Sequence, residues 1–256
     1  MRNLLPLILS FLLCTTAWAG VDLNGDADYL SCTKYAGSSG GFTVSLWMNP
    51  DSTSGVYMLA SQYDNTEGGA YFQFFINSGN IHARIHQTRD SVMIGRKDTG
   101  GVLSGWNHYA FTWSGGTTNA SIKIYVNGTQ TDDADDGAGS FTASYTGTIT
   151  FRIGAQLFNV IGVPFSGSMT DIAIWSTGLS ASEIEQISKS RVKRIPLQIN
   201  TSNLLRYWSL DNGSDGTAIS TSSGFYKDLS SNAVNCTGAD ADSDSLNEAE
   251  RILSYA

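Results

Sequence analysis

The sequence predicts an all-β protein built from antiparallel strands, with one short helix. The composition supports this prediction, because 27 glycines, only four prolines and 11% aromatic residues are typical of short strands joined by tight turns. Several segments also alternate apolar and polar residues with the period of two that a half-buried strand requires. All-β sandwiches of about 200–250 residues commonly form one domain, so we predict a single domain over residues 20–256.

Residues 1–19 are predicted to be a secretory signal peptide. Arg2 precedes an apolar run from Leu4 to Leu13, and Ala17-Trp18-Ala19 supplies the small residues of a cleavage site. The apolar run is too short to span about 30 Å of hydrocarbon. We expect cleavage before Gly20, a secreted, extracellular or periplasmic location, and no membrane span after cleavage.

Three segments show the strand alternation most clearly, namely Phe42–Pro50, Tyr109–Trp113 and Ile122–Val126. In each segment, the apolar residues at every second position share one face of the strand, and we expect that face to be buried. These residues are Phe42, Val44, Leu46 and Met48 in the first segment, Tyr109, Phe111 and Trp113 in the second, and Ile122, Ile124 and Val126 in the third.

Asn127-Gly128 follows the third segment and predicts a tight hairpin, because a type I′ turn requires positive φ at both central residues. The hairpin leads into a loop that contains Asp132, Asp133, Asp135 and Asp136. Such a loop either binds a cation or is a solvated loop tip, and we favour the solvated loop.

A short helix is predicted near residues 180–190. Ser180 and Glu183 form the sequence pattern of a capping box, and Ile184 and Ile187 lie three apart on one helix face. The basic run Lys189–Arg194 is interpreted as a solvated helix end that suits the negative pole of the macrodipole, in preference to a binding patch.

The segment Leu204–Leu210 has the character of a further strand. We interpret it as the last part of the same sandwich, with a small appended domain as the alternative and residues 240–250 as a weakly ordered tail or short helix. Cys32 and Cys236 are the cysteines left after signal cleavage. In an oxidising compartment they are expected to form a disulfide, two free thiols being the alternative.

The formal net charge of the chain is −8 at pH 7, and loss of Arg2 with the signal peptide makes it −9. A surface of this charge repels nucleic acid and anionic membranes. Neither is expected as a partner.

The order of the predicted elements resembles a known family. Trp106–Ile187 reads WNHYAFTWSG, SIKIYVNGTQ, TITFRIGAQ, FSGSMTDIAIW and LSASEIEQI in turn, and FTVSLWMNP precedes it. This pattern is similar to the LamG-like members of the concanavalin A-like jelly rolls, secreted binding and adhesion modules that include the pentraxins. The resemblance implies a two-sheet antiparallel jelly roll that binds carbohydrate or a surface protein, although the same scaffold also hosts enzymes.

Catalysis is not expected from the sequence. Glycosidases of this fold carry Glu-x-Asp-x-x-Glu on one strand, which sets two carboxylates about 5 Å apart for retaining hydrolysis, and the sequence lacks this motif. Alginate lyases of the same fold use a Gln-x-His strand. The nearest segment in this sequence, Ile85-His86-Gln87, has the reverse order. A divergent glycoside hydrolase or polysaccharide lyase is therefore the least favoured alternative.

The resemblance also suggests a structural calcium ion (Ca²⁺). Residues 21–29 are similar to an N-terminal element of the family that a bound metal ion links to a late strand. The ligands that the resemblance implies here are Asn24, Asp26, Asp28 and Asp171. The alternative is that these are turn residues and a solvent-facing strand residue. The double calcium site of pentraxins is not expected, because its acidic second half is missing after Gly154.

The face opposite the predicted core face of residues 70–76 and 81–86 is the candidate ligand face. It would combine aromatic surface with planar hydrogen-bond donors suited to sugar rings and hydroxyls, through Tyr71, Gln73, Phe75, His82, Arg84 and His86. The rim residues Tyr63, Asp64 and Asn65 are added to this ligand-binding set. The alternative is that the face packs beneath a covering loop. The expected partner is an extracellular glycan or surface protein, and the rival function is an adhesion or structural module without a small ligand.

Overall fold

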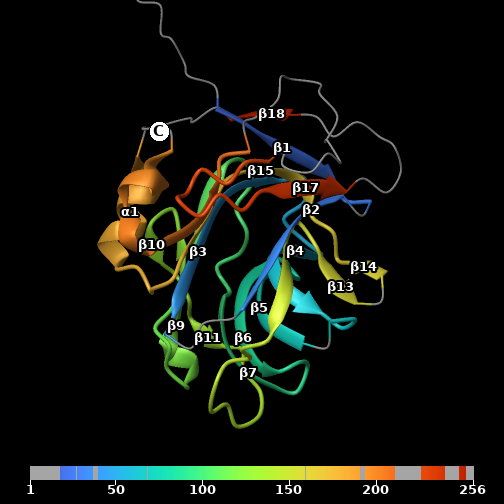
Figure 1. The fold of residues 1–256 in the computed structure, drawn as a ribbon, viewed down its shortest axis with the longest axis vertical. Helices are drawn as coiled ribbons and strands as arrows, with labels where there is room; N and C mark the ends of the chain where they lie inside the picture. Colours follow the sequence, from blue (N-terminus) through green and yellow to red (C-terminus); the bar gives the residue numbers. More distant parts are fainter. Residues whose placement is uncertain are drawn as a thin grey trace, which may run out of the picture.

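The computed structural model describes residues 18–26, 28–36, 40–67, 69–158, 160–190, 194–210, 226–239 and 248–251. Most of the predicted signal peptide, most of the acidic stretch of residues 240–250 and part of the basic run after the helix lie outside these residues. Two mainly antiparallel sheets pack face to face (Figure 1). The fold is the predicted jelly-roll sandwich.

In the part of the chain that the structure describes, the first sheet has eight strands. Their spatial order is β10 (Thr129–Gln130), β9 (Ile122–Val126), β8 (Asn107–Trp113), β3 (Phe42–Pro50), β15 (Ser166–Trp175), β1 (Trp18–Asn24) and β18 (Glu248–Arg251), and β16 (Leu204–Trp208) also pairs with β15. β1 begins two residues before the predicted cleavage point, so cleavage before Gly20 would shorten this strand.

The second sheet has ten strands among the described residues. Their order is β11 (Ala134–Asp135), β7 (Val92–Asp98), β6 (Asn80–Thr88), β5 (Gly69–Asn77), β4 (Val56–Asp64), β12 (Thr148–Ile153), β2 (Tyr29–Ala36) and β17 (Cys236–Ala239), with the hairpin β13 (Gln156–Phe158) and β14 (Val160–Gly162) attached to β4. The segment Asn119–Ser121 between β8 and β9 forms a short 3-10 helix, η1.

The core fills the space between the two sheets. Phe42 of β3 packs its ring against Tyr71 and Phe72 of the second sheet and against Phe111 and Trp113 of β8, with ring centroids 5.1 to 6.0 Å apart. All ten apolar residues that the alternation assigned to the buried faces of β3, β8 and β9 belong to this core. The alternation therefore predicted the buried face of each of these strands correctly.

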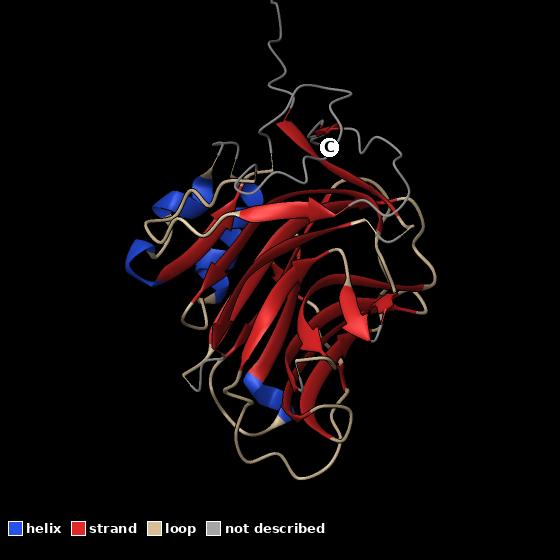
Figure 2. Cartoon of the chain, turned by 45° about the vertical axis from the view of Figure 1, so that its right-hand side comes forward, coloured by secondary structure: helices blue, strands red, loops and turns tan. Residues whose placement is uncertain are grey.

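Helical segments that follow β15, drawn in blue at the left of Figure 2, cover part of the outer face of the eight-stranded sheet. The capping box predicted at Ser180 and Glu183 starts α1 (Ala181–Lys189), and η2 (Ile195–Gln198) and η3 (Thr201–Asn203) follow it. These segments bury a second apolar cluster that includes Trp175, Tyr207, Ile184, Ile187 and Tyr125. This face of the sandwich is closed to ligands where the helices lie.

The predicted Asn127-Gly128 turn joins β9 to β10, with φ of 48° and 82°. Glycine is needed there for a second reason, because a Cβ on Gly128 would lie 3.0 Å from the Cα of Glu185 in α1. The turn thus packs directly against the helix.

The C-terminal part of the chain contributes to both sheets. β16 pairs with β15, and β17 pairs with β2 at the register that sets Cys236 opposite Cys32. The two cysteines form the predicted disulfide across 204 positions of sequence. Within the described residues, no helix is long and apolar enough to cross a membrane.

Candidate functional site

A row of polar side chains crosses the outer face of the ten-stranded sheet. Phe151 and Ile153 of β12 face the core, so Arg152 between them faces outward. The strand registers place its outward neighbours in line, so that the polar row runs from strand to strand as Ser31, Arg152, Ser61, Gln73 and Arg84.

Arg84 forms the exposed end of the polar row. Its Nε donates to Asp136 Oδ2 at 2.7 Å and its Nη2 to Asp136 Oδ1 at 3.0 Å. The guanidinium carbon stands 4.9 Å from the centre of the Phe75 ring, and His82 stacks on the same ring with centroids 4.8 Å apart. His82 Nδ1 also bonds Asp136 Oδ2 at 2.8 Å. We call these four residues the Arg84 cluster.

The Arg84 cluster is held in place electrostatically. Burial alone would raise the pKa of Asp136, but the hydrogen bond from His82 and the bonds and charge of Arg84 outweigh it and lower the pKa to about 2. The Asp136 carboxylate is therefore ionised at neutral pH. The Arg84 side chain keeps 27% of its surface exposed, whereas that of His82 keeps 7%.

Gly95 makes this arrangement sterically possible. It lies opposite Arg84 on β7, and a Cβ at this position would lie 2.5 Å from the carbonyl oxygen of Asp136. The missing side chain lets the main chain of Asp136 donate to Gly95 O at 2.9 Å, which places the carboxylate beside Arg84.

The inner part of the candidate face is buried. His86 Nε2 donates to Gln73 Oε1 at 3.0 Å, and Gln73 Nε2 donates to Gln156 Oε1 at 2.5 Å. Burial, reinforced by the charge of Arg84, lowers the pKa of His86 to about 3, so this histidine is neutral. Tyr63 packs edge-on against His86 and donates its hydroxyl to Asp90, and burial followed by this bond raises the pKa of Tyr63.

Arg152 is the most buried cation of the polar row, with 7% of the residue exposed. Its Nη2 donates to Asp64 Oδ2 at 2.9 Å. Its Nε and Nη1 are buried and have no hydrogen-bond partner among the described residues. Although burial raises the pKa of Asp64, hydrogen bonds from Thr66, Glu67 and Arg152 lower it overall.

Two segments cover the inner part of the face. Ser61 Oγ donates to Ala155 O at 2.8 Å and Gln73 reaches Gln156, so the chain that enters the β13–β14 hairpin lies over β4 and β5. At the end of β6, Tyr145 N donates to His86 O at 2.7 Å. The predicted alternative of a covering segment therefore applies to Gln73 and His86, while the Arg84 side chain is open to solvent.

Tyr71 is not on the outer face, and its assignment to the ligand set is corrected. Its ring packs in the core 5.1 Å from that of Phe42. The reason is a register shift where β4 pairs with β5: Gln62 lies opposite Phe72 and Tyr63 opposite Ala70, which leaves Tyr71 as an extra residue. Such a bulge interrupts the alternation of faces. Asn65 belongs to the turn after β4, where its main-chain nitrogen donates to Leu157 O at 3.2 Å.

The predicted calcium ligands do not converge. Asp26 N donates to Asn24 Oδ1 at 2.8 Å and Asn24 N to Asp28 Oδ2 at 3.2 Å, as in a tight turn. Asp171 accepts a hydrogen bond from Tyr207. Asn24 pairs with Ser166 of β15, and Asp171 is five positions, or roughly 17 Å, further along that strand. The described residues contain no group of three or more His, Cys, Asp or Glu side chains arranged to hold a metal ion. This arrangement does not fit one calcium ion shared by the four residues.

The acidic loop after β10 is ordered by specific partners. Arg96 bonds Asp132 Oδ2 at 2.8 Å and Asp135 Oδ1 at 2.5 Å, and Asp133 accepts hydrogen bonds from Thr99. The loop is therefore a structural edge of the ten-stranded sheet along β7.

Arg152 and the role of Asp136 were not predicted from the sequence. The alternation in Thr148–Ile153 was a sufficient signal for the outward direction of Arg152. No local signal connects Asp136 to Arg84, because 52 positions separate them.

The chain is similar to one known family and to several solved structures. The model of the concanavalin A-like lectin/glucanases superfamily matches residues 24–185. No curated protein matches the chain. A solved structure from Bacteroides ovatus, to which carbohydrate binding is ascribed, superposes with a TM-score of 0.62 at 19% identity over 93% of this chain and 62% of its own.

The CBM40 of a Ruminococcus gnavus IT-sialidase, bound to α2,3-sialyllactose, superposes with a TM-score of 0.50 at 16% identity over 68% of this chain and 98% of its own. Its complex with α2,6-sialyllactose gives 0.50 at 15% identity over the same shares. At these identities the likeness shows the fold alone, and the chain spans less than two thirds of the Bacteroides ovatus protein.

Proposed function

Because the chain belongs to the concanavalin A-like lectin/glucanase superfamily, we propose that it is a secreted, non-catalytic module that binds carbohydrate through the Arg84 cluster. Two proteins that share its fold support this proposal, since one is ascribed carbohydrate binding and the other is a CBM40 bound to sialyllactose. The disulfide supports secretion, because such bonds persist in oxidising compartments.

The Arg84 cluster is the observation that carries the proposal. The Arg84 guanidinium lies over the buried Phe75 ring, and its side chain keeps 27% of its surface exposed, so it presents a planar donor to solvent. Asp136 fixes this geometry through two hydrogen bonds, so little side-chain entropy is lost when a ligand binds. Sugar hydroxyl and ring oxygens can accept hydrogen bonds from this donor.

The carboxylates on this face favour binding over hydrolysis. Asp136 is bonded to Arg84 and His82. Asp64 is bonded to Arg152 and to the turn that follows β4. Glu67 accepts bonds from Thr150 N and Thr150 Oγ1 at 2.8 and 2.9 Å. A retaining or inverting glycosidase requires two carboxyl groups that flank the bond to be cleaved, and these carboxylates are each engaged in structural contacts.

A glycan array tests the proposal. We expect wild-type protein to retain at least one class of glycan and Arg84→Ala to lose that retention by tenfold or more. The matched control is Lys123→Ala, which removes one exposed cation from the other sheet, and its retention should equal that of wild type. Melting curves verify that all variants are folded.

The two failures of this test are distinct. Absence of glycan retention by wild type would contradict carbohydrate binding and favour an adhesion module that recognises protein. Undiminished retention by folded Arg84→Ala would leave carbohydrate binding in place and reject the Arg84 cluster as its site.

A further inference from the structure

Lys97 of β7 lies beside the Arg84 cluster on the outer face of the ten-stranded sheet. Ile94 belongs to the core, so Lys97, three positions further along the strand, faces outward. The strand register sets Lys97 directly opposite His82, and Gly95 directly opposite Arg84. Lys97 is therefore diagonal to Arg84. Diagonal residues of neighbouring strands stand about 7–8 Å apart, which is within the reach of two long side chains.

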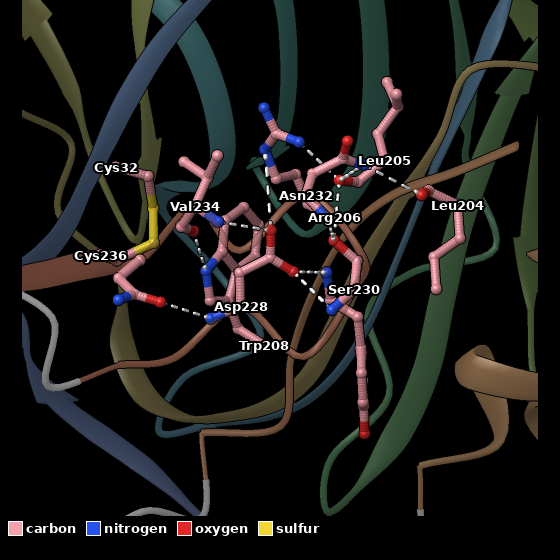
Figure 3. Close-up of polar contacts among 12 residues, drawn as sticks. Cys32, Leu204, Leu205, Arg206, Trp208, Asp228, Ser230, Asn232, Val234 and Cys236 are labelled. Atoms are coloured by element: carbon pink, nitrogen blue, oxygen red, sulfur yellow. Dashed lines mark hydrogen bonds and ion pairs between the residues drawn. A yellow bond between two sulfur atoms is a disulfide. The ribbon is translucent and has the colours of Figure 1, made fainter.

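The positive charge of Lys97 is not balanced by a neighbouring carboxylate. Several other cations of the chain have such a partner. One example is Arg206, whose Nε lies 3.9 Å from the buried carboxylate of Asp228 (Figure 3). The Lys97 side chain, in contrast, forms no ion pair and no hydrogen bond with any residue that the structure describes. The side chain is partly exposed, so its ammonium group is available to a ligand.

The other carboxylates of the acidic loop after β10 have partners of their own. These partners are Arg96 for Asp132 and Asp135, and Thr99 for Asp133. Arg96 lies opposite the core residue Ala83, so its side chain starts from the other face of β7. Asp136 is the acid of this loop that lies on the outer face, and its pKa of about 2 keeps it ionised. Arg84 and Lys97 therefore supply two positive charges there against one carboxylate.

Arg84 keeps hydrogen-bond donors for a ligand. Its Nε and Nη2 donate to Asp136, which fixes the plane of the guanidinium. Its Nη1 forms no hydrogen bond with the described residues, and the side chain keeps 27% of its surface exposed. An acceptor atom between the two side chains would therefore receive hydrogen bonds from Arg84 Nη1 and from Lys97 Nζ.

We propose that Arg84 and Lys97 together bind the acidic group of a sugar, a carboxylate or a sulfate, so that the site selects anionic glycans over neutral ones. This inference rests on the proposed carbohydrate function and names its ligand class. An anionic oxygen forms charge-assisted hydrogen bonds with both donors, and such bonds are about twice as strong as those of a neutral hydroxyl. The net charge of the chain is −8, but charges more than about 8 Å away are largely screened at physiological ionic strength. The two nearby cations therefore determine the preference.

A glycan array that pairs each acidic glycan with its neutral counterpart tests this inference. The pairs are carboxylated glycans with their carboxyl-reduced forms, and sulfated glycans with their unsulfated forms. We expect wild-type protein to retain at least one acidic glycan about tenfold more strongly than its neutral partner. The kind of pair that shows this preference distinguishes a carboxylate from a sulfate. The preference should weaken as salt is added, because salt screens the charges.

Three variants identify the residue that selects the acidic group. Lys97→Met should abolish the preference while retention of the neutral partner stays at the wild-type level. Lys97→Arg should keep the preference, because it keeps the positive charge. Lys123→Met is the matched control, since it removes one exposed cation from the other sheet and gives the same net charge as Lys97→Met. Melting curves verify that each variant is folded.

The outcomes separate this inference from the proposed function. Equal or stronger retention of the neutral partners by wild type, lost in Arg84→Ala, would overturn the selection of acidic sugars and leave carbohydrate binding at the Arg84 cluster intact. A preference for acidic glycans that is unchanged in folded Lys97→Met would overturn the role of Lys97. Retention of no glycan by wild type would overturn the function and the inference together.

Discussion

Arg84 and Asp136 form a two-pronged ion pair at the open end of the ten-stranded sheet, with hydrogen bonds of 2.7 and 3.0 Å. The pair joins β6 to the segment that follows β11. The Asp136 side chain keeps 15% of its surface exposed, so the pair is only partly screened by solvent.

Asp136→Asn should destabilise the protein by about 2 kcal/mol, because it removes the charge that Arg84 and His82 share. Urea unfolding at pH 7 measures this loss, with Asp133→Asn as a control on an exposed carboxylate of the same loop. Glycan retention should fall with it, since the guanidinium loses its fixed position. Equal stability of the two variants would contradict the structural role of Asp136.

Gly95→Ala should weaken glycan retention without touching the ligand. The added Cβ would lie 2.5 Å from the carbonyl oxygen of Asp136, so the main chain that positions the carboxylate must shift. Gly162→Ala is the control, because a Cβ there meets only the Gln156 side chain at 3.9 Å. We expect a loss of about 1–3 kcal/mol in stability for Gly95→Ala and little change for the control. Similar melting temperatures for both would show that Gly95 is not a close-approach position.

Reduction of the Cys32–Cys236 bond should lower the free energy of unfolding by up to about 5 kcal/mol, the upper bound of the chain-entropy model for so long a loop. Melting with and without a reductant measures the effect, and Cys32→Ser with Cys236→Ser should match the reduced wild type. A peptide map of unreduced protein without the linked peptide would contradict the bond.

Stability should decline as pH falls below about 6.5, because His86 resists protonation in the folded state. Its folded pKa is about 3 against an ordinary value of 6.5, so the unfolded chain takes up the proton first, and stability present above pH 6.5 is lost toward pH 3. Between pH 6.5 and 5 this single group should cost about 2 kcal/mol. His86→Gln should have a shallower pH dependence, and parallel curves for the two proteins would exclude His86 as the cause.

A chelator should leave the melting temperature unchanged, because Asp171 lies far from Asn24 along the paired strands and the four predicted ligands do not surround one point. Heating with and without a chelator, and with added calcium, measures this. A melting temperature that falls on chelation would reinstate the calcium hypothesis and require a different ligand set.

The strands and the helix could be predicted from the sequence because their signals are local. Alternation identified the buried face of β3, and a capping box identified the start of α1. The error at Tyr71 has a physical reason, since a bulge is set by the pairing of β4 with β5 and leaves no mark in the period of one strand.

The candidate site was less predictable because it depends on contacts between distant segments. The alternation placed Gln73, Arg84 and His86 on one face, and the structure agrees. It could not show that Gln156 would cover Gln73, since 83 positions separate them. The hairpin after β12 therefore determines which residues of this face reach solvent, and the strands themselves do not.

The last strands of the chain set the minimum length of any useful fragment. Trp208 of β16 stacks on Phe151 with centroids 5.4 Å apart, and Cys236 of β17 holds Cys32. A piece cut at the limits of the family match, residues 24–185, would uncover that aromatic ring and leave a lone thiol prone to intermolecular crosslinking. Binding studies on an isolated domain therefore need a polypeptide that extends at least to Ala239.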